Sequence, residues 1–183
     1  MSGVFLRPLR LSDAESMLAW MNDPDSTRYL GGGFEKKRTL EDVRESIGLR
    51  LDGEFTGETF AVADGETGEY LGQCDLLLPD EKAGRAEIAV VLLPRYRGRG
   101  YARQALMLLM KFAFENGYNR LFLKVCAENV PAVKLYESLG FVREGTLRRH
   151  VRVGDRLCDV VVYGMLKEDF ETLHGSDILS NER

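Results

Sequence analysis

A short stretch rich in arginine and glycine carries residues suited to binding an anion. Arg95–Arg103 has the sequence RYRGRGYAR, with four arginines in nine residues, and it lies between an apolar run and a helical pattern. Backbone N–H groups at the start of a helix, together with the positive end of the helix dipole, favour an anion. Gly98 and Gly100 let the backbone approach a phosphate closely. The stretch therefore predicts a cradle for a diphosphate.

Other interpretations of this loop have to be weighed. Arg103 stands where a dinucleotide-binding fingerprint has its third glycine, and the sequence contains no G-x-x-x-x-G-K-[ST] motif. Those two nucleotide-binding motifs are therefore excluded. When the loop is considered alone, a solvent-exposed basic turn is as good an interpretation as a diphosphate cradle.

A second group of candidate residues follows the loop, after a predicted helix and a predicted strand. Asn129 and Tyr136 are seven residues apart, which places them on one face of a short helix. Asn129 and Pro131 are typical of a helix start, and Gly140 is typical of a helix end. Each residue also has a purely structural interpretation, Asn129 as a helix cap and Tyr136 as a half-buried aromatic.

Taken in this order, the two stretches resemble the GCN5-related N-acetyltransferase (GNAT) superfamily. Arg97–Ala102 matches the family's R/Q-x-x-G-x-G/A acyl-CoA motif, and Asn129–Phe141 matches its N-x6-Y-x3-G-F stretch. The resemblance covers about residues 4–170. The opening Leu6–Leu9 and the long C-terminal hairpin are most similar to the branch of spermidine and ribosomal-protein alanine acetyltransferases.

The resemblance implies a fold and a place for the acyl donor. The fold is of the α+β (mixed α/β) class, a single domain with a central, splayed, mostly antiparallel mixed sheet flanked by helices. Acyl-CoA would bind in the gap beside the strand Glu87–Leu93. The backbone of Val90, Val91 and Leu92 would pair with the pantetheine arm, and a nearby N–H would hold the thioester oxygen.

The resemblance also implies roles for the residues of the two motifs. Asn129 would hydrogen-bond the cofactor near its pantetheine part, and Tyr136 would lie beside the sulfur. The diphosphate would be held by the amides and side chains of Arg97, Gly98, Arg99, Gly100, Tyr101, Ala102 and Arg103.

Acetyl transfer from a thioester to an amine needs a base and an acid. An alkyl amine is mostly protonated near pH 7, so a general base must remove a proton before the attack. The chain has only two histidines, His150 and His174, so carboxylates are the better candidates. Glu87 fits the position where many family members carry a base glutamate, although it could equally be a surface charge at a strand end. The Tyr136 phenol would protonate the leaving thiolate.

Composition places these residues in a soluble domain. A length of 183 residues suits one domain, expected over 1–173 with a flexible tail over 174–183. The net charge of −4 argues against nucleic acid. Three widely spaced cysteines indicate a reducing cytosol and neither disulfides nor a metal site. The chain lacks a long apolar run or a signal-peptide layout, which predicts a cytoplasmic protein away from membranes.

The elements that must position the site can be placed along the chain. Helices are predicted from a Ser12–Glu15 capping box to about Asn22, from Thr39 onward, over 101–116 and over about 129–138. A strand is predicted over 4–9, a hairpin over 59–78, a strand buried on both faces over 87–93, a strand over 121–126, and a hairpin over 141–166.

The acceptor is less well specified by the sequence. Gly31–Gly33 and the acids Glu35, Glu41, Asp42, Glu45, Asp52, Glu54 and Glu58 are consistent with a mobile lid and an acidic mouth for a cationic amine, or with a solvated helix face. A protein N-terminus is another possible acceptor. The hairpin over 141–166 has apolar Val160–Val162, which suits either a homodimer contact or the core. A non-catalytic acyl-CoA-binding sensor or scaffold is the alternative function, and it could dispense with Tyr136 and Glu87.

Overall fold

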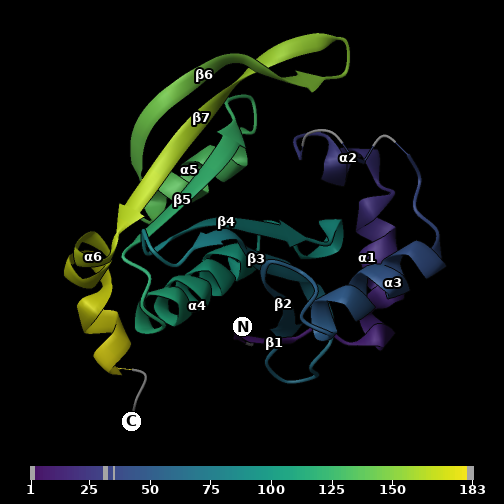
Figure 1. Ribbon diagram of the computed structural model, residues 1–183, viewed down its shortest axis with the longest axis horizontal. Coiled ribbons are helices and arrows are strands. Elements are labelled where there is room, and N and C mark those ends of the chain that lie inside the picture. Colours follow the sequence, from purple (N-terminus) through teal and green to yellow (C-terminus); the bar gives the residue numbers. More distant parts are fainter. Residues whose placement is uncertain (1–2, 31–32, 35, 181–183) are drawn as a thin grey trace.

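A computed structural model describes residues 3–30, 33–34 and 36–180, and within its last helix the side chains up to residue 175. In this part of the chain, seven strands form one sheet in the order β1-β2-β3-β4-β5-β7-β6 (Figure 1). The strands are β1 (Val4–Pro8), β2 (Gly57–Asp64), β3 (Tyr70–Asp80), β4 (Arg85–Leu92), β5 (Arg120–Cys126), β6 (Val142–Val153) and β7 (Arg156–Leu166). The α-helices are α1 (Ala14–Met21), α2 (Pro24–Thr27), α3 (Leu40–Leu51), α4 (Tyr101–Glu115), α5 (Val130–Ser138) and α6 (Lys167–Ser180), and the 3-10 turns are η1 (Leu11–Asp13) and η2 (Pro94–Tyr96).

The sheet splits between its two central strands. β4 and β5 are parallel and pair only over Arg85–Glu87 with Arg120–Phe122, whereas every other neighbouring pair is antiparallel. Beyond Glu87 the two strands diverge. The predicted class is confirmed: a mixed, mostly antiparallel, splayed sheet flanked by helices.

Helix α4 covers one face of the first half of the sheet (Figure 1). Its apolar stripe includes Ala105, Leu106 and Leu109, all fully buried, and it packs in one core cluster with Ala86 and Ile88 of β4. Apolar residues three and four apart share a helix face, so this sequence can form a helix only if that face is covered.

Helices α1 and α3 cover the opposite face of β2 and β3. Met17 and Trp20 of α1 and Val43 and Ile47 of α3 form a second core cluster with Tyr70 of β3. α3 begins at the predicted place, because the Thr39 side chain caps its first turn in a reciprocal capping box.

Strand β4 differs from the sequence prediction on one of its faces. Ala86, Ile88 and Leu92 are buried on the α4 side, but Glu87 and Val91 on the other side are only half-buried. The prediction of burial on both faces is therefore wrong, and the physical reason is the split, which leaves a cleft along this part of the strand.

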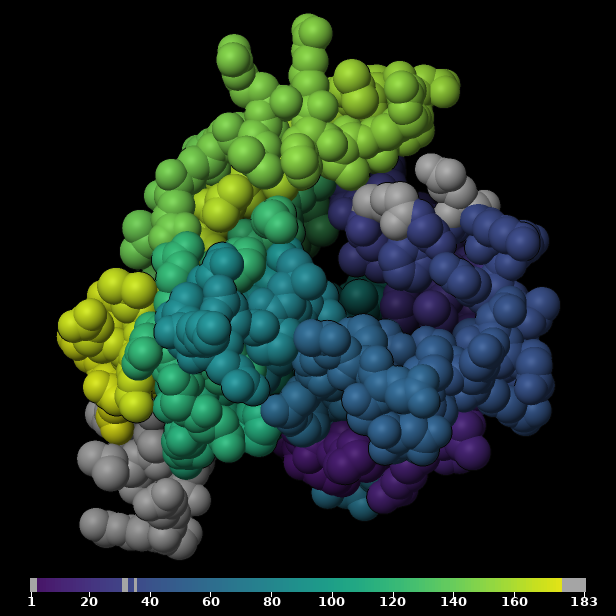
Figure 2. All heavy atoms as spheres, in the orientation of Figure 1, coloured from purple at the N-terminus to yellow at the C-terminus, as the bar shows by residue number. Residues whose placement is uncertain are grey.

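The second half of the sheet carries α5, α6 and the long predicted hairpin of β6 and β7. Val160 and Val161 of β7 are buried within the chain itself, so they belong to the core of this half. β6 is the outer strand of the hairpin and is exposed over most of its length. Figure 2 shows the surface hollowed between this hairpin and the segment that carries α2 and α3.

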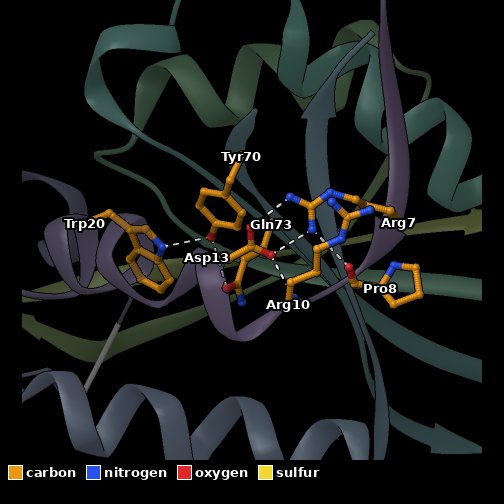
Figure 3. Close-up of polar contacts among 7 residues, drawn as sticks. All are labelled: Arg7, Pro8, Arg10, Asp13, Trp20, Tyr70 and Gln73. Atoms are coloured by element: carbon orange, nitrogen blue, oxygen red, sulfur yellow. Dashed lines mark hydrogen bonds and ion pairs between the residues drawn. The ribbon is translucent and has the colours of Figure 1, made fainter. Parts of the chain in front are cut away.

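The first helix begins differently from the prediction. Ser12 does not cap it; the chain makes the turn η1, and α1 starts at Ala14. The Asp13 carboxylate accepts the Arg10 N–H at 2.8 Å and pairs with the Arg7 guanidinium at 2.8 Å (Figure 3). This ion pair is buried, so Asp13 is held at the helix entrance and replaces the predicted capping box.

The chain end and one loop also need comment. α6 runs to Ser180, and His174 is buried with Nε2 3.0 Å from the Leu139 carbonyl oxygen; the flexible tail expected over 174–183 stays a prediction. The short helix α2 was not predicted. Gly31, Gly32 and Glu35 lie outside the described residues, and the extent of the domain over 1–173 stays a prediction.

Candidate functional site

A cleft of about 720 Å³ opens where β4 and β5 separate. Its walls come from α1, α3, β3, β4, β5, α5 and the loop before α4. The cleft passes through the sheet, so it has a side toward the α4 N-terminus and a side toward α1 and α3. We call these the donor side and the acceptor side.

The backbone of β4 is open along the cleft. On its inner edge, Val90 pairs with Cys74 and Val91 with Gln73 of β3. On its outer edge, pairing with β5 ends at Glu87 in the described residues. An unpaired strand edge offers a row of N–H and C=O groups to an extended ligand. Val90, Val91 and Leu92 thus line the cleft as predicted.

The loop before α4 presents its backbone to the donor side. Gly98 and Gly100 have φ of 71° and 80°, a conformation that side chains rarely adopt. Gly100 is the N-cap of α4, and both glycines line the cleft with Tyr101 and Ala102. The first N–H groups of a helix have no partner within the helix. The loop therefore has the free hydrogen-bond donors that binding of an anion requires.

Two arginines of the loop line the cleft while holding its walls together. Arg97 donates from Nε to the Leu92 carbonyl oxygen at 3.0 Å and from Nη2 to Ser26 Oγ at 2.6 Å. Arg103 donates from Nη1 to the Ser138 carbonyl oxygen at 3.0 Å. They connect the loop to the end of β4, to α2 and to the end of α5.

The other two arginines lie elsewhere. Arg95 pairs with Glu69 at 3.2 Å. The Arg99 guanidinium is 5.9 Å from the centre of the Tyr96 ring, and Arg99 is absent from the described lining of the cleft. Of the predicted diphosphate residues, Arg99 is thus the one that the structure does not bring to the cleft.

Helix α5 places the second motif on the donor side. Asn129 is the N-cap residue of α5 but makes no side-chain capping bond, so its amide is available to the cleft that it lines. Tyr136 lies two helical turns after Asn129. It is 7% exposed and packs edge-on against Phe141, with 5.9 Å between ring centres. Burial raises the pKa of Tyr136 to about 12. Its phenol therefore keeps its proton at neutral pH.

Glu87 lies at the vertex of the split. Its side chain is 16% exposed, and Oε2 is 3.1 Å from Lys124 Nζ of β5. This ion pair bridges the two strands where their pairing ends. Glu87 was predicted beside the gap and lines the cleft, and Lys124 is a neighbouring cation that was not predicted.

Sequence reasoning missed a second acid in the cleft. Asp75 of β3 is 6% exposed and lines the acceptor side. Burial is the main cause that raises the pKa of its carboxyl group, and hydrogen bonds from Thr59 and Gln73 and the charge of Arg50 oppose the shift. The available signal was a lone acid inside the apolar run YLGQCDLLL of residues 70–78.

A chain of buried polar groups orients Gln73, whose side chain contacts Asp75. Trp20 Nε1 donates to the Tyr70 hydroxyl at 3.2 Å, and that hydroxyl donates to Gln73 Oε1 at 3.4 Å (Figure 3). The Gln73 Nε2 atom is then directed toward Asp75, 3.2 Å from each carboxylate oxygen. Buried polar groups need such partners, so the network fixes the side chain of Gln73.

The acids that precede β3 do not form a mouth. Glu58 is paired with Leu76 in the sheet and shares its α4 face, and Asp42 is occupied by the Thr39 cap. Within the described lining of the cleft, the following acids are absent: Glu41, Asp42, Glu45, Asp52, Glu54 and Glu58. They match a solvated helix face better than an acidic mouth, and Glu35 lies outside the described residues.

Cysteine and membrane features can be stated for the described chain. Cys74, Cys126 and Cys158 are buried and free, and Cys126 lines the cleft. Among the described residues, no group of three or more His, Cys, Asp or Glu side chains is close enough to hold a metal ion. None of the described helices is long and apolar enough to cross a membrane.

Known structures share this fold. The spermidine N-acetyltransferase from Vibrio cholerae, solved in complex with CoA and spermine, aligns with a TM-score of 0.83 and 24% identity over 91% of this chain and 97% of that chain. RimL, a ribosomal alpha-N-protein acetyltransferase solved in complex with coenzyme A, aligns with a TM-score of 0.79 and 17% identity over 91% and 95% of the two chains.

Sequence comparison identifies the family. The family model described as "Acetyltransferase (GNAT) domain" matches residues 4–142. The chain is 33% identical over 168 residues to the uncharacterized N-acetyltransferase p20 of Bacillus licheniformis, across 90% of this chain and 93% of that protein. The chain therefore belongs to the GNAT family and is an N-acetyltransferase.

Proposed function

We propose that this chain transfers an acetyl group from acetyl-CoA to a primary amine, which attacks the thioester directly while both substrates are bound. The observation that carries the proposal is the split between β4 and β5, which contains an open strand edge and the buried phenol of Tyr136. An extended thioester donor and a nucleophile can meet in this cleft from its two sides.

The donor side suits a molecule with a diphosphate and an extended arm. The arm would pair with the open edge of β4 at Val90–Leu92 and receive the Asn129 amide. The diphosphate would take the N–H groups around Gly98 and Gly100, where backbone amides and the helix dipole favour an anion. Arg97 and Arg103 flank that position with their remaining N–H groups.

Tyr136 has the properties of the acid. Its raised pKa leaves the phenol protonated at neutral pH, and among the described residues its hydroxyl has no hydrogen-bond partner. A thiolate that leaves the acetyl carbon would take this proton, which makes the sulfur a better leaving group. Backbone N–H groups of β4 would stabilise charge on the thioester oxygen.

A carboxylate would serve as the base. Glu87 is the candidate from the sequence, and its position at the vertex places it within the cleft. Its carboxylate is already paired with the Lys124 ammonium at 3.1 Å. Asp75 is the other described carboxylate in the cleft.

The acceptor would be a small cationic amine or a protein N-terminus. Both classes are represented among the structural neighbours, one solved with spermine and one named for acetylation of a ribosomal protein. We also propose that the protein works in the cytoplasm. A homodimer stays a prediction.

A thiol-release assay tests the proposal. The chain is incubated with acetyl-CoA and a panel of polyamines, aminoglycosides, aryl-alkyl amines and N-terminal peptides, and free thiol is measured against amine concentration. Amine-dependent release is expected for at least one class. Calorimetric binding of acetyl-CoA with no release for any amine would instead indicate a non-catalytic acyl-CoA-binding module.

A further inference from the structure

We infer that Asp75 receives the amine of the acceptor and takes its proton, and that the acceptor carries this amine on an apolar body. The inference rests on the proposed function, since it assigns the acceptor half of the same cleft. It replaces Glu87 as the base and narrows the acceptor class.

The register of the sheet directs Asp75 into the cleft beside Glu87. Asp75 pairs with Ala89, and Leu77 pairs with Glu87, so both carboxylates project from the same face. Diagonal neighbours on a sheet face are about 7–8 Å apart. Asp75 therefore lies two residue pairs farther into the open part of the split, where β4 is no longer paired with β5.

The carboxylate of Asp75 lacks a counter-ion. Its Oδ1 accepts Thr59 Oγ1 at 2.7 Å, and both oxygens accept Gln73 Nε2. Among the described residues it forms no ion pair, whereas Glu87 is paired with Lys124. A buried charge is costly unless it is paired, so Asp75 is suited to a cation that arrives with the substrate.

Burial favours proton transfer to Asp75, whereas the groups that face it, Thr59, Gln73 and Arg50, oppose that shift. The nearest cation is Arg50 of α3, which reaches Asp75 only through Thr59, with 3.2 Å from Nε to Oγ1. Arg50 is itself held by Ser46 and stacks on Phe55. From β3 the neutral Tyr70 phenol lies behind Gln73, from β4 and β5 the Glu87–Lys124 pair stands next to the site, and α1 contributes apolar side chains.

Apart from Ser46, Arg50 and Gln73, the rest of the acceptor side is mostly apolar. Its described lining is drawn from α1, the segment before α3 and the residues after α3, and includes Met17, Trp20, Met21, Leu30, Phe34 and Phe55. The Trp20 and Phe34 rings are 6.0 Å apart between centres.

This lining disfavours a polyamine. A polyamine carries several ammonium groups along its length, and each one buried requires its own partner. In the described lining only Asp75 and Glu87 are acidic, and Glu87 already has Lys124. One ammonium group followed by an apolar or aromatic body matches these walls.

The proton and bond changes balance with these two residues. The acceptor ammonium gives one proton to Asp75, and the neutral nitrogen forms a C–N bond with the thioester carbonyl carbon. The C–S bond breaks, and the leaving sulfur takes the Tyr136 proton. The second surplus proton on nitrogen returns to the Tyr136 oxygen, and Asp75 releases its proton to solvent. The sum is one amide, one thiol and one proton.

The test compares three carboxylate variants in the full chain. Asp75→Asn should lower kcat/KM for the amine about 10²–10³-fold with unchanged calorimetric affinity for acetyl-CoA. Asp80→Asn is the matched control, because Asp80 lies on the same strand but is exposed and paired with Arg85, and it should leave kcat/KM unchanged. Glu87→Gln should keep the acidic limb of the pH profile of kcat/KM, and Asp75→Asn should lose it.

Three acceptors test the substrate class. We expect 2-phenylethylamine, or a tetrapeptide that begins with phenylalanine, to exceed spermidine in kcat/KM by at least about tenfold. Which of the first two is faster distinguishes a small amine from a protein N-terminus. A preference for spermidine would overturn the apolar-body assignment.

Two results separate the inference from the function on which it rests. Wild-type activity together with an Asp75→Asn variant within threefold of it would overturn the role of Asp75 and leave the acetyltransferase proposal intact. Absence of thiol release by the wild type with any amine would overturn both. If circular dichroism shows that Asp75→Asn does not fold, the role of Asp75 is tested instead by measuring the activity of Asp75→Ala with and without added formate. Restored activity supports the inference, and a folded variant that formate does not restore contradicts it.

Discussion

Burial has opposite uses at the two residues that we assign to proton transfer. At Tyr136 it raises the pKa to about 12, so the phenol stays protonated until the leaving sulfur develops charge, although it is a weaker acid than an ordinary tyrosine. At Asp75 it raises the pKa from that of an ordinary aspartate and makes the carboxylate a stronger proton acceptor. Titratable groups whose environments suit them to separate roles are typical of acid–base pairs in enzymes.

Removal of the Tyr136 hydroxyl should affect the chemical step and spare binding. Tyr136→Phe keeps the ring packed on Phe141, so we expect turnover to fall about 10²-fold with nearly unchanged acetyl-CoA affinity. Single-turnover kinetics and calorimetry measure the two quantities. An unchanged rate in the chemical step would remove Tyr136 from the mechanism.

The ionised Asp75 carboxylate should lower the free energy of unfolding. Because its folded-state pKa is raised, the folded state binds more protons than the unfolded state between the unfolded pKa, about 3.9, and the folded value. Stability therefore falls as pH rises through that window. Asp75→Asn should therefore raise the free energy of unfolding at pH 7, measured by urea denaturation.

Asp80→Asn is the control for this stability effect. The Ala83 N–H lowers the pKa of Asp80, so loss of that charge should not stabilise the fold. A stability equal to or below wild type for Asp75→Asn would contradict the view that the site holds an uncompensated charge.

The sequence led to candidate residues that line the donor side, but it missed the acceptor-side acid. The seven-residue spacing places Asn129 and Tyr136 on one helix face, which is a local property, and the roles proposed for them come from the family resemblance. Asp75 acquires its environment from Thr59 of β2, Gln73 of β3 and Arg50 of α3. Such a pocket is assembled from distant segments, and a single sequence does not show which segments meet.

At the scale of elements, the loop before α4 allows its arginines to be ranked. Arg97 lines the cleft and is bonded to Leu92 and Ser26, whereas Arg99 lies over Tyr96. Arg97→Ala should therefore weaken acetyl-CoA binding in calorimetric titration more than Arg99→Ala, and both should affect binding more than the chemical step. An affinity for acetyl-CoA that is unaltered in both variants would contradict the assignment of this loop to the diphosphate.

The open edge of β4 depends on a glycine in the strand beside it. An added Cβ at Gly72 would overlap the Val91 carbonyl oxygen and press on Leu92, so Gly72→Ala must displace the edge that we assign to the donor. We expect a destabilisation of about 1–3 kcal/mol and a weaker affinity for acetyl-CoA. Denaturation and calorimetry on the same sample measure both.

Gly48→Ala provides a matched control for that substitution. Gly48 lies within α3, and a Cβ there meets nothing within 4 Å. Replacement of a helical glycine by alanine stabilises by about 0.5–1 kcal/mol, and the affinity for acetyl-CoA should stay the same. If Gly72→Ala behaves like Gly48→Ala, β4 does not depend on the close approach of β3.

Element boundaries were predicted well where local chemistry sets them. Thr39 starts α3 through its own cap, and the glycines at 98 and 100 adopt the conformations that the loop requires. The start of α1 differs from the prediction because Asp13 forms an ion pair with Arg7 of β1, and a contact between two elements is not visible in a local pattern. α6 was not predicted, and it contacts another element through His174, whose Nε2 lies 3.0 Å from the carbonyl oxygen of Leu139, the residue that follows α5.

At the scale of the whole molecule, two half-sheets meet along a three-residue parallel pairing. Each half has its own cover of helices, α1, α3 and α4 on the first and α5 and α6 on the second (Figure 1). The cleft has walls from both halves, so in the proposed arrangement a donor on β4 and α4 would face an acceptor among α1, α3 and β3.

The resemblance carried by the two motifs implied this architecture, and the sheet order and the short β4–β5 pairing agree with it. The acceptor class was beyond the sequence, since the acids near residues 35–58 suggested a mouth that the described cleft does not contain. The acceptor side is lined instead by aromatic and apolar residues from three separate segments, whose meeting depends on the complete fold.

The central claim, direct acetyl transfer to an amine in the split between β4 and β5, is tested most directly by product stoichiometry. The full chain is mixed with acetyl-CoA and an amine, and mass spectrometry counts the N-acetylated amine while a thiol reagent counts free coenzyme A. We predict one amide for each thiol, formed only when the amine is present. Thiol release at the same rate without amine, or no amide product from any amine in the panel, would contradict the claim.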